Sequence, residues 1–257
     1  YDGGRYATPE DARSQVDRLI EAGADILDIG GESSRPGAQH VSAREQIARL
    51  TPAVTHALSR GALVSIDTTD PTVADHMLQA GAHLVNDVSC LADPELARVC
   101  ARHSATLLLM HARGPMSRMA GFSEYPEHGY SDVVSEVLAE WRAARDRAIE
   151  MGMPRERIWL DPGLGFGKNA RHSFALLNAL PKLAAEGVPV VVGPSRKSFI
   201  RLVDEVPPEQ RLGGTIAAAV LSVELGARVL RVHDVRDIHQ ALVVSRAIRQ
   251  VPEASRA

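Results

Sequence analysis

The strongest constraint on the fold is a repeated pattern in which a short apolar run ends in a polar residue and leads into a helix. The clearest copy spans residues 158 to 168, where an apolar run ends at Asp161 and Pro162 and is followed by a loop with three glycines. Short apolar runs bounded by turn residues are typical of buried strands, and proline interrupts a strand ladder. Asp161 is therefore predicted at the carboxyl end of a strand, where α/β proteins place their chemistry.

The pattern recurs along the chain. Strands are predicted at 24–30, 62–67, 83–87, 106–111, 158–161, 189–193 and 228–234. Helices are predicted at 9–22, 42–59, 71–79, 94–103, 132–151, 172–185, up to about 225, and 237–250. In three places a helix ends, a glycine follows and a strand begins: 21–24, 79–82 and 224–227. Continuous apolar strands that alternate with helices indicate a parallel sheet covered on both faces.

This order of elements predicts an α/β fold of the (β/α)8 TIM barrel type. Seven strands are predicted, whereas a closed barrel needs eight. Because the chain opens in a loop that leads into a helix, we expect the first strand and its loop upstream of Tyr1. A length of 257 residues suits one barrel, so residues 1–257 are predicted to form a single domain. An open doubly wound sheet is the alternative; it needs no further strand, but the chain lacks a dinucleotide fingerprint.

Composition excludes several classes of partner. The net charge is −3 and the pI about 6.4, so nothing indicates nucleic-acid binding. No apolar run approaches the roughly 20 residues that span a bilayer. The two cysteines, Cys90 and Cys100, lack the spacing of metal ligands and are predicted to be free thiols in a reducing compartment such as the cytoplasm, with a disulfide as the alternative.

Polar residues gather at the predicted strand ends, which in a barrel all face one opening. They are Asp28, Asp67, Asn86, Asp87, His111, Asp161, Ser195, Lys197, Arg231 and His233. Buried charges need partners, so these side chains must pair with each other or with a ligand. The acceptors Asp67, Asn86 and Asp161 suit the N–H edge of a flat heterocycle. The cationic side chains Arg35, Lys197, Arg231 and His233 suit a phosphate or another anion.

Other polar residues have simpler interpretations. Lys168 is predicted to be a solvated loop residue, and His111 a hydrogen-bonded histidine beneath the long loop after its strand. Asp28 and Asp87 are expected to orient backbone and neighbouring side chains. Asp234 is expected to cap a helix or to support His233.

Six segments together resemble one known family. They are 30–37 (GGESSRPG), 65–68 (SIDT), 85–88 (VNDV), 161–168 (DPGLGFGK), 195–198 (SRKS) and 231–234 (RVHD). In this order, and across essentially the whole chain, they resemble the dihydropteroate synthases of folate biosynthesis. The resemblance implies a barrel, usually a homodimer, that is a target of sulfonamides. It also implies a transferase that forms a C–N bond between 6-hydroxymethyl-7,8-dihydropterin pyrophosphate and p-aminobenzoate, releases pyrophosphate and uses Mg²⁺.

The resemblance also implies roles for individual residues. Pterin-binding residues would be Asp67, Asn86, Met110, Asp161, Phe166, Gly193 and Lys197. Ser34, Arg231 and His233 would bind pyrophosphate, and Arg35, Pro36, Lys197 and Ser198 would bind p-aminobenzoate. The catalytic set would be Asp67, Asp161, Lys197, Arg231 and His233. No metal ligand is expected within the chain, because the asparagine of the Mg²⁺ site would lie upstream of Tyr1.

Two other functions stay open at this point. A methyltetrahydrofolate methyltransferase would share the acidic pterin edge, but it has no need of the basic segments 195–198 and 231–234. A non-catalytic pterin-binding paralogue would keep the acidic residues that bind the pterin but would not catalyse a reaction.

Overall fold

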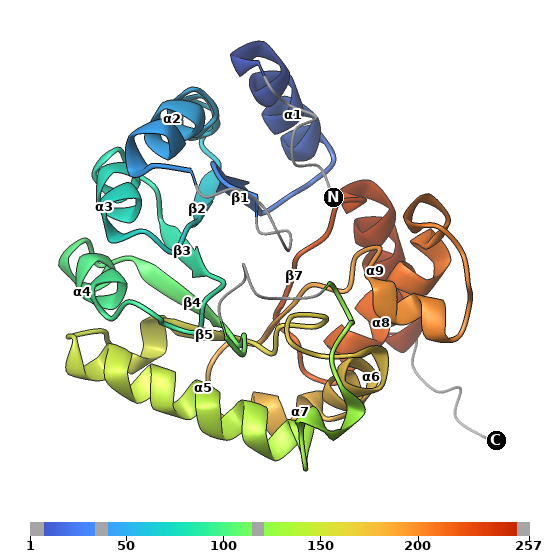
Figure 1. Ribbon diagram of the computed structural model, residues 1–257. Coiled ribbons are helices and arrows are strands. Elements are labelled where there is room, and N and C mark those ends of the chain that lie inside the picture. Colours follow the sequence, from blue (N-terminus) through green and yellow to red (C-terminus); the bar gives the residue numbers. More distant parts are fainter. Residues whose placement is uncertain (1–7, 34–40, 115–120, 251–257) are drawn as a thin grey trace.

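The computed structural model describes residues 8–33, 41–114 and 121–250, in which strands and helices alternate around a common centre (Figure 1). The strands are β1 (Ile26–Gly30), β2 (Leu63–Asp67), β3 (Leu84–Asp87), β4 (Thr106–Met110), β5 (Ile158–Asp161), β6 (Val191–Val192) and β7 (Val229–Leu230). All seven predicted strands are present, although β6 and β7 are shorter than predicted.

Helices occupy the outside of this arrangement (Figure 1). The α-helices are α1 (Pro9–Glu21), α2 (Ala43–Ser59), α3 (Pro71–Gln79), α4 (Glu95–Arg102), α5 (Val133–Glu150), α6 (Ala170–Asn178), α7 (Leu180–Ala184), α8 (Leu212–Glu224) and α9 (Val235–Gln250). Short 3-10 helices are η2 (Glu127–Gly129), η3 (Arg155–Arg157), η4 (Ser198–Leu202) and η5 (Pro208–Gln210).

The strands follow one another in sequence order and run parallel. Strands β1 to β5 form one sheet in the order β1-β2-β3-β4-β5, and β6 pairs with β7. The two sheets join where Leu160 N donates to Pro189 O at 3.0 Å. A doubly wound sheet reverses its strand order at a switch point, whereas this consecutive order is that of a β/α barrel. The described strands do not close the barrel between β7 and β1, and an eighth strand upstream of Tyr1 stays a prediction.

Both faces of the central strands are buried, as the apolar strand sequences predicted. All four residues of β3 are buried, and in β4 Leu107 and Leu109 are 0 % exposed. Each fully buried aliphatic side chain contributes about 1.5–3 kcal/mol to folding. Trp141 of α5 packs with these strand residues in the larger apolar core. The residues at the strand ends are therefore held in place by a well-packed core.

The helices predicted at 9–22 and 42–59 begin next to capping residues. Thr8 caps α1 by accepting from Asp11 N, and Ser42 caps α2. The single helix predicted at 172–185 is wrong, because α6 ends at Asn178 and α7 begins at Leu180. The break precedes Pro181, which lacks an N–H and disfavours helical backbone in the residue before it.

The two cysteines are free thiols, as predicted. Burial raises the pKa of Cys90 to about 11 and that of Cys100 to about 12. Among the helices of the described residues, none is both long enough and apolar enough to cross a membrane.

Candidate functional site

The strand register brings together four residues predicted to bind a heterocycle. Asp67 of β2 pairs with Asn86 of β3, and Met110 of β4 pairs with Asp161 of β5. Each lies in the last two residues of its strand. Because the strands are parallel, these side chains share one end of the barrel.

A cluster of charged hydrogen bonds connects the last described strand to the first two. Arg231, directly after β7, donates from Nε to Asp28 Oδ2 at 2.6 Å and from Nη2 to Asp67 Oδ2 at 3.2 Å. Asn86 Nδ2 donates to the same Asp28 oxygen at 3.0 Å. The predicted pyrophosphate ligand Arg231 therefore lies beside the predicted heterocycle acceptors.

Burial shifts the pKa of three of these groups. Burial, and then the neighbouring Asp28 carboxylate, raise the pKa of Asp67 to about 7, although Arg231 opposes the shift. Burial also raises the pKa of Asp161 and lowers that of Lys197 to about 8. Perturbed carboxyl and ammonium groups that converge in one place are typical of functional sites.

Asp28 has a further feature that sequence reasoning missed. Its Oδ2 orients Asn86, as expected, but its Oδ1 is buried and has no hydrogen-bond partner among the described residues. A buried acceptor without a partner is costly. Asp28 Oδ1 is therefore a candidate acceptor for a ligand N–H.

A ring slot, formed by Met110, Phe166, Gly193 and Lys197, lies next to the acidic residues. Met110 and Phe166 share an apolar cluster, and Lys197 Nζ lies 4.9 Å from the centre of the Phe166 ring. A Cβ added at Gly193 would lie 3.7 Å from Lys197 Nζ, so Gly193 lies directly beside the ammonium. Phe122, which was not predicted, packs edge-on against Phe166 with ring centres 5.1 Å apart.

The loop 163–167, here called the slot loop, begins in a position that only glycine fits. Gly163 has φ of +65°, and a Cβ there would lie 2.0 Å from the backbone oxygen of His111. Its N–H donates to Asp161 Oδ1 at 2.7 Å. The turn therefore holds the Asp161 carboxylate in place.

The prediction that Lys168 is a solvated loop residue is wrong. Lys168 is 0 % exposed, and its Nζ donates to His111 Nδ1 at 2.8 Å and to the backbone oxygens of Phe166 and His111 at 2.9 and 3.2 Å. The chain after the slot loop turns inward, and these three acceptors offset the cost of burying the ammonium. His111 is 0 % exposed and hydrogen-bonded, as predicted.

The loop after β6 carries the remaining predicted residues. His233 Nδ1 lies 2.9 Å from Ser195 Oγ, and that oxygen also accepts from His233 N at 3.2 Å. Asp234 accepts from Arg196 Nε at 2.9 Å, so its carboxylate is tied to the same loop. Asp87 accepts from Ser89 N at 2.9 Å, in keeping with its predicted orienting role.

Ser198 begins η4 and connects two loops. Its Oγ donates to Phe122 O at 3.1 Å and lies 2.7 Å from Ser123 Oγ. The predicted anchor for a carboxylate is thus held next to the ring slot by the loop after β4. Ser34, Arg35 and Pro36 lie outside the described residues.

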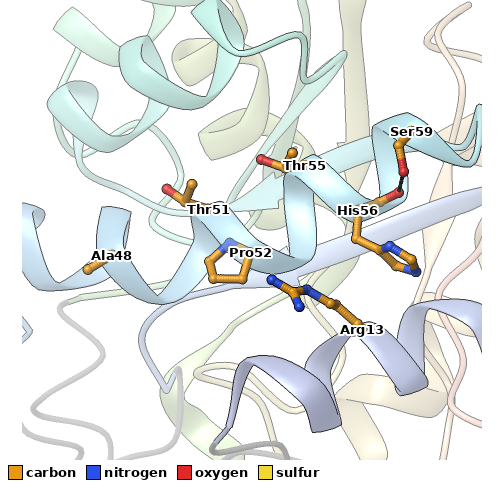
Figure 2. Close-up of a pocket in the computed structure, with 7 residues that line it drawn as sticks. All are labelled: Arg13, Ala48, Thr51, Pro52, Thr55, His56 and Ser59. Atoms are coloured by element: carbon orange, nitrogen blue, oxygen red, sulfur yellow. Dashed lines mark hydrogen bonds between the residues drawn. The ribbon is translucent and has the colours of Figure 1, made fainter.

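A separate groove of about 630 Å³ lies between α1 and α2 (Figure 2). Figure 2 shows Arg13 of α1 facing Pro52 and His56 of α2. None of the predicted site residues lines this groove. This groove is therefore separate from the candidate site at the strand ends.

Comparison with known proteins identifies the relatives of this chain. The sequence model of the family described as "Pterin binding enzyme" matches residues 1–233. The dihydropteroate synthase of Mycobacterium leprae is 43% identical over 250 residues, which are 95% of this chain and 87% of that protein.

Solved structures agree with the sequence comparison. The Yersinia pestis dihydropteroate synthase with a sulfonamide drug complex has a TM-score of 0.89 and 35% identity, covering 97% of this chain and 90% of that chain. The Xanthomonas albilineans dihydropteroate synthase with 4-aminobenzoic acid has a TM-score of 0.87 and 39% identity, covering 98% of this chain and 89% of that chain.

Proposed function

The chain belongs to the dihydropteroate synthases among the pterin binding enzymes, and we propose that its strand-end residues catalyse the reaction of that family. The reaction joins 6-hydroxymethyl-7,8-dihydropterin pyrophosphate to p-aminobenzoate and releases pyrophosphate. The observation that carries the proposal is the convergence of Asp28, Asp67 and Asn86 on Arg231 at one end of the barrel. The relatives reported above are dihydropteroate synthases, so they support neither a methyltransferase nor a non-catalytic paralogue.

The pterin ring is proposed to bind in the ring slot. Asp161, Asp67 and Asn86 supply acceptors and a donor for the amino-pyrimidinone edge, because a carboxylate can accept two parallel N–H bonds. Asp28 Oδ1 is one further acceptor at this edge. Met110 and Phe166 supply apolar walls, and Lys197 lies near enough to donate to the ring.

The pyrophosphate is proposed to lie against Arg231 and His233, with Ser34 added from outside the described residues. The guanidinium has five N–H donors, and Arg231 uses Nε and one Nη2 donor in its ion pairs. Three donors therefore stay available for an anion. Stabilising the charge that develops on the leaving group is an electrostatic role that a preorganised arginine suits.

The second substrate is proposed to enter beside Phe166, with its carboxylate at Ser198 and its ring near Lys197, Arg35 and Pro36. The C–O bond to pyrophosphate breaks, and Asp67 and Asp161, in their ionised forms, stabilise positive charge on the pterin. The amine of p-aminobenzoate attacks the methylene carbon, forms the C–N bond and loses a proton. No covalent bond to the enzyme is needed.

Magnesium stays a prediction from the resemblance. Within residues 8–33, 41–114 and 121–250, no group of three or more His, Cys, Asp or Glu side chains could hold a metal ion. These side chains by themselves therefore do not form a Mg²⁺ site among the described residues. No step above uses the ion.

A homodimer in the cytoplasm is also proposed. Large apolar side chains are exposed on neighbouring faces of α8 and α9, namely Leu221, Val243, Val244 and Ile248. Exposed apolar patches mark interaction surfaces, and the groove between these helices is lined by Val220, Val244 and Ile248. Sedimentation should show a dimer that the pair Val244→Asp and Ile248→Asp dissociates, whereas Val203→Asp, on an exposed residue elsewhere, should not.

The direct test of the function measures pyrophosphate release with both substrates. The full-length wild-type protein should turn over, should be inhibited by a sulfonamide, and should bind p-aminobenzoate only after the pterin substrate or with pyrophosphate present. Asp161→Asn should lose most of this activity, because the amide cannot stabilise positive charge. Near-normal turnover of this variant contradicts the role given to Asp161.

A further inference from the structure

Lys168 is a charged side chain that is 0 % exposed and that the mechanism above does not use. Its ammonium has three protons, and three acceptors surround it: His111 Nδ1, His111 O and Phe166 O. A neutral amine has two protons, so this arrangement requires the charged form. The same ammonium thus binds Phe166 O of the slot loop and two atoms of His111, the residue directly after β4.

The partner of His111 determines which ring nitrogen carries the proton. His111 Nε2 lies 2.9 Å from Glu140 Oε2, and a hydrogen bond between Glu140 and His111 is the main cause that lowers the pKa of Glu140, to about 2. The ionised carboxylate accepts, so Nε2 carries the proton and Nδ1 is left to accept from Lys168. Arg113 also pairs with Glu140 and lies 3.9 Å above the Tyr130 ring.

Every carbonyl of the slot loop is held by a different group. Gly163 O accepts from Phe166 N, and Gly165 O accepts from Ser123 N, each at 3.1 Å. The other three accept from side chains: Leu164 O from Lys197 Nζ at 2.7 Å, Phe166 O from Lys168 Nζ at 2.9 Å and Gly167 O from Tyr130 Oη at 3.0 Å. The slot loop forms no strand pairing of its own, so its conformation depends on these five hydrogen-bond donors.

We propose that Lys168 is a positioning residue that sets the slot loop, and with it Phe166 and the Asp161 turn, in the geometry that binds the pterin substrate. Glu140 acts in the same role by fixing the tautomer of His111. The proposal deepens the proposed function and rests on it for the identity of the ligand. Neither Lys168 nor Glu140 touches substrate.

The titratable groups that act on Lys168 come from four parts of the fold. Asp161 ends β5, Lys197 follows β6, Cys90 follows β3 and Glu140 lies on α5. Burial is the main cause that lowers the pKa of Lys168 to about 7, while Asp161 opposes the shift. The charged, positioning form is therefore the main form below about pH 7 and declines above it.

The first experiment measures the Kd of the pterin substrate by calorimetry for the wild type and Lys168→Met. Removing an outer group that orients the binding groups of a metal site costs about 10–100-fold in affinity or activity, and Lys168→Met should weaken pterin binding by a similar factor at pH 6. The factor should shrink at pH 8, where the wild type has also lost the charge. Binding within twofold of the wild type at pH 6 overturns the proposal, and the same weakening at both pH values overturns the loss of the Lys168 charge between them.

A double-mutant cycle tests the connection through His111. Glu140→Gln should also weaken binding, and the double variant with Lys168→Met should lose less than the product of the two factors, because both act on one network. Arg142→Gln is the matched control, since it lies on the same helix and its carboxylate partner, Glu186, is outside this network. Fully multiplicative effects overturn the connection, and if Lys168→Met does not fold, Glu140→Gln alone decides.

Hydrogen exchange in the free protein separates this inference from the proposed function. Amides of 163–167 should exchange faster in Lys168→Met than in the wild type, whatever the ligand is. Wild-type protein without pyrophosphate release, but with this exchange difference, overturns the function and leaves the positioning role supported. Unchanged exchange overturns the positioning role.

Discussion

Arg231 Nε donates to Asp28 Oδ2 at 2.6 Å, so a residue after the last described strand is bound to a residue of the first. The contact bridges the interval between β7 and β1, where the described strands do not pair. It also delivers a guanidinium to the acidic edge of the site. This one ion pair thus connects the ends of β7 and β1 and also places a positive charge beside the acidic residues of the site.

Replacing Arg231 by glutamine should lower kcat/KM for the pterin substrate. Removing one preorganised stabilising donor costs about 10²–10³-fold in rate, and the two carboxylates left behind should repel each other. Steady-state assays of pyrophosphate release check this. The matched control is Arg102→Gln, because Arg102 pairs with Asp75 on the outer helices. An Arg231→Gln enzyme as active as this control would contradict the leaving-group role.

Asp67 should make the folded protein less stable as the pH rises from about 4 to about 7. Its pKa rises from 3.8 to about 7 on folding, mainly through burial. The folded state therefore holds a proton that the unfolded state has released, and this stabilising contribution is lost as pH rises from about 4 to about 7. Urea denaturation of Asp67→Asn should lack this slope relative to the wild type.

The control for that slope is Asp75→Asn, on the exposed side of α3. The hydrogen bond from His103 lowers the pKa of Asp75, so its contribution is already complete above the unfolded value of 3.8. The wild type and Asp75→Asn should therefore have parallel stability curves between pH 5 and 7. A parallel curve for Asp67→Asn would show that the Asp67 pKa is not raised.

Gly163→Ala should destabilise the protein more than a comparable glycine substitution. The added Cβ would lie 2.0 Å from His111 O in a backbone with φ of +65°. Gly61→Ala is the matched control, because Gly61 has φ of +74° and open space around it. The control should lose about 1–2 kcal/mol from backbone strain alone. Thermal or urea unfolding should show a clearly larger loss of unfolding free energy for Gly163→Ala than for Gly61→Ala. Equal losses would mean that the turn at Gly163 can shift to accommodate the added methyl group.

Chelation tests the cofactor. Treatment with EDTA should abolish pyrophosphate release, and added Mg²⁺ should restore it. Full activity after exhaustive chelation would remove Mg²⁺ from the reaction.

Local sequence features predicted much of this structure, for identifiable reasons. Apolar runs located all seven strands, and the helices predicted at 9–22 and 42–59 begin within one residue of those bounds, because strand burial and helix starts depend on near neighbours. The residues at strand ends were placed together correctly, because parallel strands must present their carboxyl ends on one side. The break at Pro181 was missed because the apolar periodicity continues across it.

Lys168, Asp28 and Phe122 show what the sequence could not decide. Local pattern placed Lys168 in a polar loop, yet the fold buries it against His111 and Phe166. Asp28 looked like an orienting residue, yet it holds Arg231 from a position 203 residues away. Sequence by itself determined which residues stand at strand ends. The tertiary structure alone decided their charge states and partners, because burial and long-range pairing arise only when distant segments pack together.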